Sequence, residues 1–280
     1  MKFTASLMAA GLVAFGAPLA TAQPKPPPAV KVAPVAAPTA ADWRTPNPDD
    51  VLVIETNKGR IIVEMVPETA PLYTTRMRDL TKAHFFDGQT FFRVIEGFMA
   101  QTGDPENRGT GGSDQPDVKA EFMFRRGPQT PFVLMQDQSV AEIGFIKSLP
   151  VATQSMMLAP MTRDGKIAGF GLYCPGEAGA ARGGEDDSAN SQFFLMRDHY
   201  PALERRYSAW GRVIFGQSVV NAIKVGEPVP DPQDKMLQVR LLSDIPEAQR
   251  PKVRVIDPAG PWFKAEIART LAAKGADVSA

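Results

Sequence analysis

The stretch from Phe85 to Pro105 constrains the fold of this 280-residue chain more than any other segment. Its sequence, FFDGQTFFRVIEGFMAQTGDP, contains two runs of aromatic and aliphatic residues that are interrupted at Gly97. Runs of this kind between Gly and Asp turns are typical of short β-strands. The first run carries Arg93 and the second carries Gln101. The composition therefore predicts one guanidinium held beside an apolar surface.

Short strands dominate the pattern beyond this stretch. Residues 51–55 and 60–66 alternate around a turn at 57–59, which is typical of a β-hairpin. Helical spacing within this part of the chain is confined to residues 68–83 and 218–224. The remaining strand-like runs are residues 91–95, 98–101, 192–196, 210–215 and 237–242. Many short strands with few helices favour a closed or sandwiched β architecture over a doubly wound sheet.

The N-terminus has the pattern of an export signal. Lys2 precedes an apolar stretch, residues 7–19, that is too short for a stable membrane span, and residues 20–22 form a small-x-small cleavage site. We therefore expect residues 1–22 to be a signal peptide and the mature chain to be exported, in a periplasm. An uncleaved membrane anchor is the alternative. The Pro- and Ala-rich residues 23–48 predict a semi-rigid, solvated tether.

Charge and cysteine content bear on several classes of function. The formal net charge of zero argues against a nucleic-acid partner held by phosphate neutralisation. Cys174 is the only cysteine, so the chain has no internal disulfide framework. With His84 and His199 as its only histidines, it has no His/Cys cluster for zinc, and we expect no metal or other cofactor. A catalytic pair of Cys174 with a histidine stays open beside an inert buried thiol.

Two segments stand outside the strand pattern. Residues 125–172 are punctuated by proline and rich in Gln and Met, yet too apolar for a disordered linker. We expect this insertion to pack on the β-domain. Residues 258–274 carry apolar side chains at helical spacing before Gly275, which predicts a helix in a C-terminal extension, residues 246–280. That helix would either dock on the body of the protein or form an oligomer contact.

Residues 85–104 resemble the catalytic-arginine segment of the cyclophilin family of peptidyl-prolyl cis–trans isomerases. The family pattern is F-Y-D-G-x-x-F-H-R-V-I-x-G-F-M-x-Q-x-G-D, and nearly all of it is present. The other matching blocks are residues 109–113, 119–122, 188–195 (SANSQFFL) and 203–213 (LERRYSAWGRV). Together the blocks cover residues 51–245 apart from the insertion. Several ordered blocks are far more specific than a single short motif.

The resemblance implies a fold and a set of site residues. The fold is a closed eight-stranded antiparallel β-barrel capped by two α-helices, within residues 49–245, with a substrate groove on its outer face. Arg93 would be the catalytic guanidinium, and Gln101 would brace it. The residues implied to line the proline pocket are Phe98, Met99, Phe194, Leu203 and Tyr207. Gln192 and Ala181 would contact the peptide backbone beside it.

The chain departs from the family pattern at four positions near this site. Phe92 replaces the histidine before the arginine, and Tyr207 stands where many members have histidine. Ala202 replaces a tryptophan that favours binding of the inhibitor cyclosporin, and Ala180 replaces a methionine. None of these changes removes the arginine or the apolar pocket. We expect weak cyclosporin sensitivity and an altered peptide preference.

The resemblance implies an isomerase that acts on Xaa-Pro bonds, with proline-containing peptides or unfolded proteins as partners. The export signal predicts that these clients are exported or envelope proteins. A holdase that binds proline-containing segments with little turnover is an alternative. A scaffold subunit assembled through the C-terminal helix is another, and the oligomeric state stays open.

Overall fold

The structure is a computed structural model that describes residues 36–274. The predicted signal peptide, residues 1–22, and the first part of the predicted tether lie outside the described residues. Within residues 36–274, no helix is both long and apolar enough to cross a membrane.

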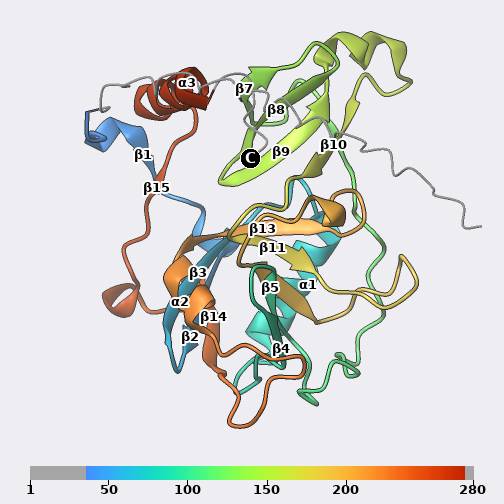
Figure 1. Cartoon of the computed structure of the whole chain (residues 1–280), viewed down its shortest axis with the longest axis vertical. Coiled ribbons are helices and arrows are strands. Elements are labelled where there is room, and N and C mark those ends of the chain that lie inside the picture. Colours follow the sequence, from blue (N-terminus) through green and yellow to red (C-terminus); the bar gives the residue numbers. More distant parts are fainter. Residues whose placement is uncertain (1–35, 275–280) are drawn as a thin grey trace, which may run out of the picture.

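Eight antiparallel strands form one curled sheet, the main sheet, in the lower half of Figure 1. In spatial order these strands are β14 (Met236–Leu241), β2 (Val51–Thr56), β3 (Gly59–Met65), β13 (Ala209–Phe215), β11 (Glu177–Ala180), β12 (Phe193–Met196), β5 (Met99–Thr102) and β4 (Arg93–Ile95). Helices α1 (Pro71–Lys82) and α2 (Gln217–Ala222) pack apolar side chains into the core of this sheet. The mainly-β class and the two helices of this region agree with the sequence pattern.

The predicted closure of this sheet into a barrel is not confirmed. Strands β14 and β4 are its edges, and within residues 36–274 no ladder joins them. The segments beside these edges meet at an isolated bridge between Thr90 and Lys235, flanked by backbone hydrogen bonds of Met236 with Gly88 and Gln89. The outer edge of the three-residue strand β4 instead pairs with a loop, through a bridge between Val94 and Gly226. The sheet is therefore a curled half-barrel whose free edge is covered by a loop.

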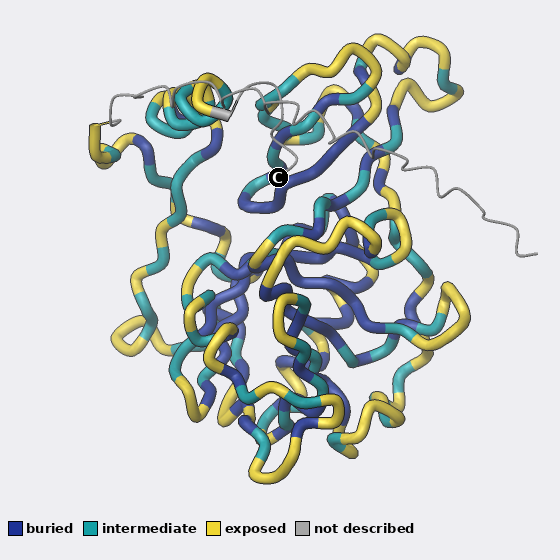
Figure 2. The backbone as a smooth tube through the Cα atoms, in the orientation of Figure 1, coloured by how far each residue is buried: buried dark blue, intermediate teal, exposed yellow. Residues whose placement is uncertain are grey.

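Aromatic residues fill the interior of the main sheet. Trp210, Phe193 and Phe86 are buried, and Phe193 stands edge-on to both of the other rings at centroid distances of 5.7 Å. This region is the largest block of buried backbone in Figure 2. Because neighbouring side chains on a strand point to opposite faces, an inward Phe193 places Phe194 on the outer face.

The insertion folds into a second, five-stranded antiparallel sheet above the main sheet (Figure 1). Its strands, in spatial order, are β6 (Phe124–Arg126), β10 (Ile167–Gly171), β9 (Leu149–Gln154), β8 (Ala141–Ile146) and β7 (Phe132–Asp137). Its buried side chains share a core with the outer face of the main sheet, in agreement with the expected packing. The sequence pattern did not indicate these strands, because Pro150 argues against a central strand such as β9.

The two ends of the described chain pair with each other, so the last part of the predicted tether, residues 42–44, packs on the protein and is not a solvated linker. Strand β1 (Trp43–Arg44) pairs with β15 (Val255–Ile256), and the guanidinium of Arg254 lies 4.6 Å from the centroid of the Trp43 ring. Asp42 accepts a hydrogen bond from the backbone N–H of Trp262 at 3.0 Å. One aromatic and one charged side chain thus supply contacts that a Pro/Ala segment lacks.

The predicted C-terminal helix is present as α3 (Pro261–Lys274). Phe263 stands edge-on to Phe145 of the second sheet, with ring centroids 5.2 Å apart, so this helix docks on the insertion. The short 3₁₀ helices are η1 (Ala40–Asp42), η2 (Pro48–Asp50), η3 (Met156–Met161), η4 (Pro201–Leu203), η5 (Leu242–Asp244) and η6 (Glu247–Gln249).

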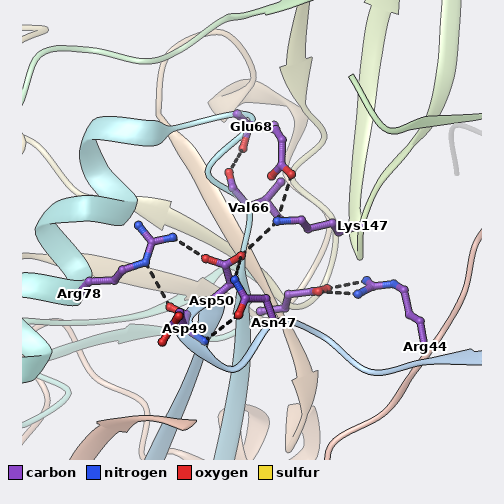
Figure 3. Close-up of polar contacts among 10 residues, drawn as sticks. Arg44, Asn47, Asp49, Asp50, Val66, Glu68, Arg78 and Lys147 are labelled. Atoms are coloured by element: carbon purple, nitrogen blue, oxygen red, sulfur yellow. Dashed lines mark hydrogen bonds and ion pairs between the residues drawn. The ribbon is translucent and has the colours of Figure 1, made fainter. Parts of the chain in front are cut away.

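Ion pairs connect the N-terminal segment and the second sheet to the main sheet (Figure 3). Lys147, in the turn between β8 and β9, lies 3.3 Å from Asp50 and 3.0 Å from Glu68. Arg44 donates two hydrogen bonds, of 2.6 and 2.7 Å, to the carboxylate of Glu64, which is 1% exposed. A buried carboxylate of this kind depends on its partner, because an unpaired buried charge is costly.

We predict that Arg44→Ala lowers the free energy of unfolding by about 2–3 kcal/mol, because it leaves Glu64 buried without its cation. Urea unfolding at neutral pH measures this loss. Arg60→Ala is the matched control, since the Arg60–Glu55 pair is far more exposed. That change is expected to cost less than about 1 kcal/mol. Equal losses in the two variants would contradict a structural role for the N-terminal segment.

A second buried acid lies between the two sheets. Glu177 on β11 is fully buried, and neither of its carboxyl oxygens has a hydrogen-bond partner within the described chain. Burial raises the pKa of Glu177 well above its ordinary value of 4.5, although Arg212, opposite it on β13, acts to lower it. Burial therefore favours the protonated form of this carboxyl group in the folded protein.

The sign of the resulting pH dependence follows from the raised pKa. The unfolded chain releases the Glu177 proton near pH 4.5 and the folded chain releases it only at a higher pH, so stability falls as the pH rises above 4.5. We predict that Glu177→Met raises the free energy of unfolding at pH 7.5 by more than about 1 kcal/mol. The gain should shrink towards pH 4.5 in urea unfolding. A gain independent of pH, or one matched by Glu185→Met on an exposed loop, would contradict this account.

Candidate functional site

Three neighbouring strands set one row of side chains on the outer face of the main sheet. Arg93 of β4 pairs with Gln101 of β5, and Gln101 pairs with Phe194 of β12. Directly opposed residues in an antiparallel ladder share a face, so the three side chains lie in line. Gly179 of β11 continues the row opposite Phe194. A Cβ atom at Gly179 would lie 2.3 Å from the Phe194 ring, so only glycine allows the ring to lie flat there.

A cavity of about 90 Å³, which we call the slot, opens along this row. The rings of Phe194 and Tyr207 stand edge-on at 5.7 Å and form part of its wall. Its lining residues are Arg93, Phe98, Met99, Gln101, Ala181, Arg182, Phe194, Leu203 and Tyr207. The structure therefore brings together every residue that the resemblance assigns to the site except Gln192, which lies beside the slot.

The guanidinium of Arg93 is held at two of its nitrogens. Its Nη1 donates to Oε1 of Gln101 at 3.2 Å, and its Nε donates to Oε1 of Glu227 at 2.6 Å. Gln101 in turn donates to the side-chain oxygen of Gln192 at 2.9 Å, and Gln192 donates to the carbonyl of Gly111 at 2.8 Å. This relay of amides fixes the orientation of Gln101, and Gln101 braces the arginine.

Two charged residues at the site were not indicated by the sequence. Arg182 lines the slot, and its guanidinium lies 4.9 Å from the ring centroid of Tyr207. Its position directly after Ala181 could have suggested it. Glu227 is 134 residues from Arg93 and lies in a proline-rich loop, so no local pattern links it to the arginine.

A second, larger cavity of about 420 Å³ adjoins the slot and shares Gln101, Ala181 and Arg182 with it. The loop at residues 109–113 forms one wall. Asp104 anchors that loop by accepting hydrogen bonds from the backbone N–H groups of Glu106, Arg108, Gly109 and Thr110. Burial raises the pKa of Asp104, but these donors outweigh it and hold the pKa below its usual range. The loop that forms this wall is therefore anchored by an ionised carboxylate.

The structure bears on the catalytic pair of Cys174 with a histidine that the sequence left open. Burial raises the pKa of Cys174 to about 11, so the thiol is protonated at neutral pH. No hydrogen bond in the described region joins it to His84 or His199. Among residues 36–274, no group of three or more His, Cys, Asp or Glu side chains is placed to hold a metal ion.

Comparison with known proteins agrees with this geometry. The family described as Cyclophilin type peptidyl-prolyl cis-trans isomerase/CLD matches residues 51–242. A probable peptidyl-prolyl cis-trans isomerase of Brucella suis is 28% identical over 214 residues, which cover 71% of this chain and 85% of that protein. The crystal structure of cyclophilin AquaCyp293 from Hirschia baltica has a TM-score of 0.76 and 34% identity, and covers 81% of this chain and 86% of its own.

The match over residues 51–242 shows that the chain belongs to the cyclophilin family of peptidyl-prolyl cis–trans isomerases. The curled antiparallel sheet and its outer slot agree with that assignment, and proline-containing peptides are the substrates that the family binds.

We predict that Gly179→Ala lowers kcat/KM for a proline peptide by at least about tenfold, because the new methyl group displaces the Phe194 ring, and small misplacements at a site are costly. A protease-coupled isomerisation assay measures it, with thermal unfolding as the check on folding. Gly184→Ala is the matched control, since no atom lies within 4 Å of a Cβ there. If both variants match the wild type, the packing of the Phe194 ring against Gly179 has no role in the site.

Proposed function

We propose that this protein accelerates rotation about Xaa-Pro bonds in exported or envelope proteins, with the proline ring in the slot and Arg93 as the catalytic guanidinium. The observation that carries the proposal is the position of Arg93 at an apolar slot, braced by Gln101. Membership of the cyclophilin family supports the reaction. The signal-like pattern of residues 1–22 supports the exported clients and a periplasmic location.

The reaction breaks no bond, and its barrier comes from amide resonance. Rotation about the peptide bond costs roughly 18–20 kcal/mol, and uncatalysed exchange before proline takes tens of seconds or longer. Turnover in milliseconds requires a factor of about 10⁴, which is about 5–6 kcal/mol at the barrier. At the twisted transition state, the proline nitrogen becomes pyramidal and gains a lone pair.

Arg93 suits this transition state. A fixed cationic donor that bonds the developing lone pair, or holds the carbonyl oxygen, stabilises the twisted amide selectively. One positioned donor contributes about 3–4 kcal/mol. The slot supplies the remainder by removing water from the amide, because a desolvated amide has less charge separation to lose on twisting. Arginine suits the role better than lysine, since its planar fork bonds Gln101 and a substrate together.

The peptide would continue from the slot into the adjoining cavity. Ala181 lines both cavities and Gln192 lines the second one, and both would contact the peptide backbone, as the resemblance implies. The N–H of Ala181 already donates to the carbonyl of Gln192 at 2.9 Å. Ala181 would therefore offer its carbonyl oxygen to the peptide.

A holdase role is a second candidate, and the surface of the insertion favours it. Met157 and Met161 on η3 are 83% and 82% exposed, and flexible Met side chains adapt to varied apolar partners. In this alternative the slot and the Met surface retain unfolded segments, and turnover is incidental. An Arg93 variant separates the two functions, since a holdase would suppress aggregation equally well without the guanidinium.

We predict that Arg93→Ala lowers kcat by about 10²–10³, the usual effect of removing one transition-state donor. Affinity for a proline peptide, measured by titration, should change only a few-fold, because the apolar walls remain. Arg163→Ala, on the surface of the insertion, is the control and should match the wild type. A wild-type protein that does not accelerate isomerisation, or an Arg93→Ala variant with full rate, would overturn the proposed mechanism.

The same assay run across pH tests the chemistry independently. No acid, base or nucleophile takes part, so we expect kcat/KM to be nearly flat between mildly acidic and mildly alkaline pH. A steep titration near neutrality would mean that a proton-transfer group acts in the reaction.

A further inference from the structure

The loop between α2 and β14, residues 224–235, is clamped against the strand that carries Arg93. Gly226 and Val94 exchange two backbone hydrogen bonds of 2.8 Å, and the N–H of Val229 donates to the carbonyl of Phe92 at 2.8 Å. These bonds hold the loop on both sides of Arg93 in the sequence. The ammonium of Lys224 draws the loop closed by donating to the carbonyl of Pro230 at 2.7 Å. Glu227 therefore stands on a backbone that is fixed relative to β4.

Glu227 binds Arg93 at the nitrogen nearest the aliphatic part of the side chain. Its Oε1 lies 2.6 Å from Nε, whereas Gln101 takes Nη1. In residues 36–274 the remaining nitrogen, Nη2, makes no hydrogen bond. Glu227 is also absent from the residues that line the slot. It contacts the arginine outside the slot and does not occupy the place of a peptide.

We propose that Glu227 is a positioning residue for the isomerisation: it fixes the plane of the Arg93 guanidinium so that Nη2 stays directed to the substrate. This inference rests on the proposed function of Arg93. Gln101 alone holds the guanidinium at one point, about which it can rotate. A second contact on another nitrogen, from a separate element, removes that rotation. Both contacts exist before substrate binds, so none of the binding energy of the peptide is needed to order the arginine side chain.

The negative charge of Glu227 weakens the electrostatic effect of Arg93 on a substrate, whereas its hold on the guanidinium favours catalysis. The exposure of the pair decides which of these two effects prevails. The Arg93 and Glu227 side chains are 36% and 56% exposed, so water and salt screen the carboxylate. The geometric restraint is not screened in this way. The net effect of an exposed pair is small, and removing it should change a rate by about 3- to 5-fold.

The experiment compares three single variants in the protease-coupled isomerase assay, using the mature protein. Glu227→Ala is expected to lower kcat by about 3- to 5-fold with KM within about twofold, since the contact orders a transition-state donor. Glu227→Gln retains an acceptor oxygen and should keep more than half of the wild-type kcat. Asp231→Ala is the matched control, because it removes an acidic side chain from the same loop without touching Arg93. It should equal the wild type.

A second readout needs no turnover. In ¹⁵N NMR spectra, the Arg93 Nε–H proton of the wild type should exchange with water several-fold more slowly than in Glu227→Ala. Equal exchange in the two proteins would overturn the positioning role. So would a Glu227→Ala variant with the wild-type kcat or a higher one, or equal losses in Glu227→Ala and Asp231→Ala. A wild-type protein without isomerase activity would instead refute the proposed function, which keeps the two failures distinct.

Discussion

The register between β4, β5 and β12 is the constraint on which the site depends. Arg93, Gln101 and Phe194 share the outer face only because their strands pair in this register. A slip of one residue would turn an entire set of side chains to the other face, which would bury the arginine in the interior. Inward-facing apolar residues such as Phe193 and Val94 prevent this slip, because they are buried in the core of the main sheet. The chemistry on the outer face is therefore specified by hydrophobic burial on the inner one.

The second sheet supports the slot from behind. Phe194 belongs to the same buried cluster as Phe124 and Ile146 of the insertion, and Tyr173 lies 5.9 Å from the Phe194 ring. Buried side chains of the insertion therefore share a core with the Phe194 ring. The Lys147 contacts with Asp50 and Glu68 hold the turn of this sheet against the main sheet.

The residues that the sequence identified lie in blocks where strand pattern and motif agree. Arg93, Gln101 and Phe194 could be placed because each is a few residues from aromatic or glycine neighbours that define its strand. Closure of the sheet could not be decided in this way, because it depends on whether a three-residue edge strand meets β14 or the loop beside it. Glu227 could not be predicted either, because its contact with Arg93 depends on the tertiary folding of a proline-rich loop. The strands of the insertion were hidden by Pro150 and by glycines within them.

The tyrosine at position 207, one of the departures from the family pattern, is explained by its two neighbours in the wall of the slot. Tyr207 stands edge-on to Phe194 on one side and contacts the Arg182 guanidinium at 4.9 Å on the other. Histidine in place of Tyr207 would offer Arg182 a smaller ring, and a protonated imidazole would repel it. Tyr207 thus presents a larger aromatic face to a second cation at the slot. The Nε and Nη1 of Arg182 donate to backbone carbonyls, and its Nη2 lies 3.6 Å from the carboxylate of Asp186, so this guanidinium is held by contacts outside the slot.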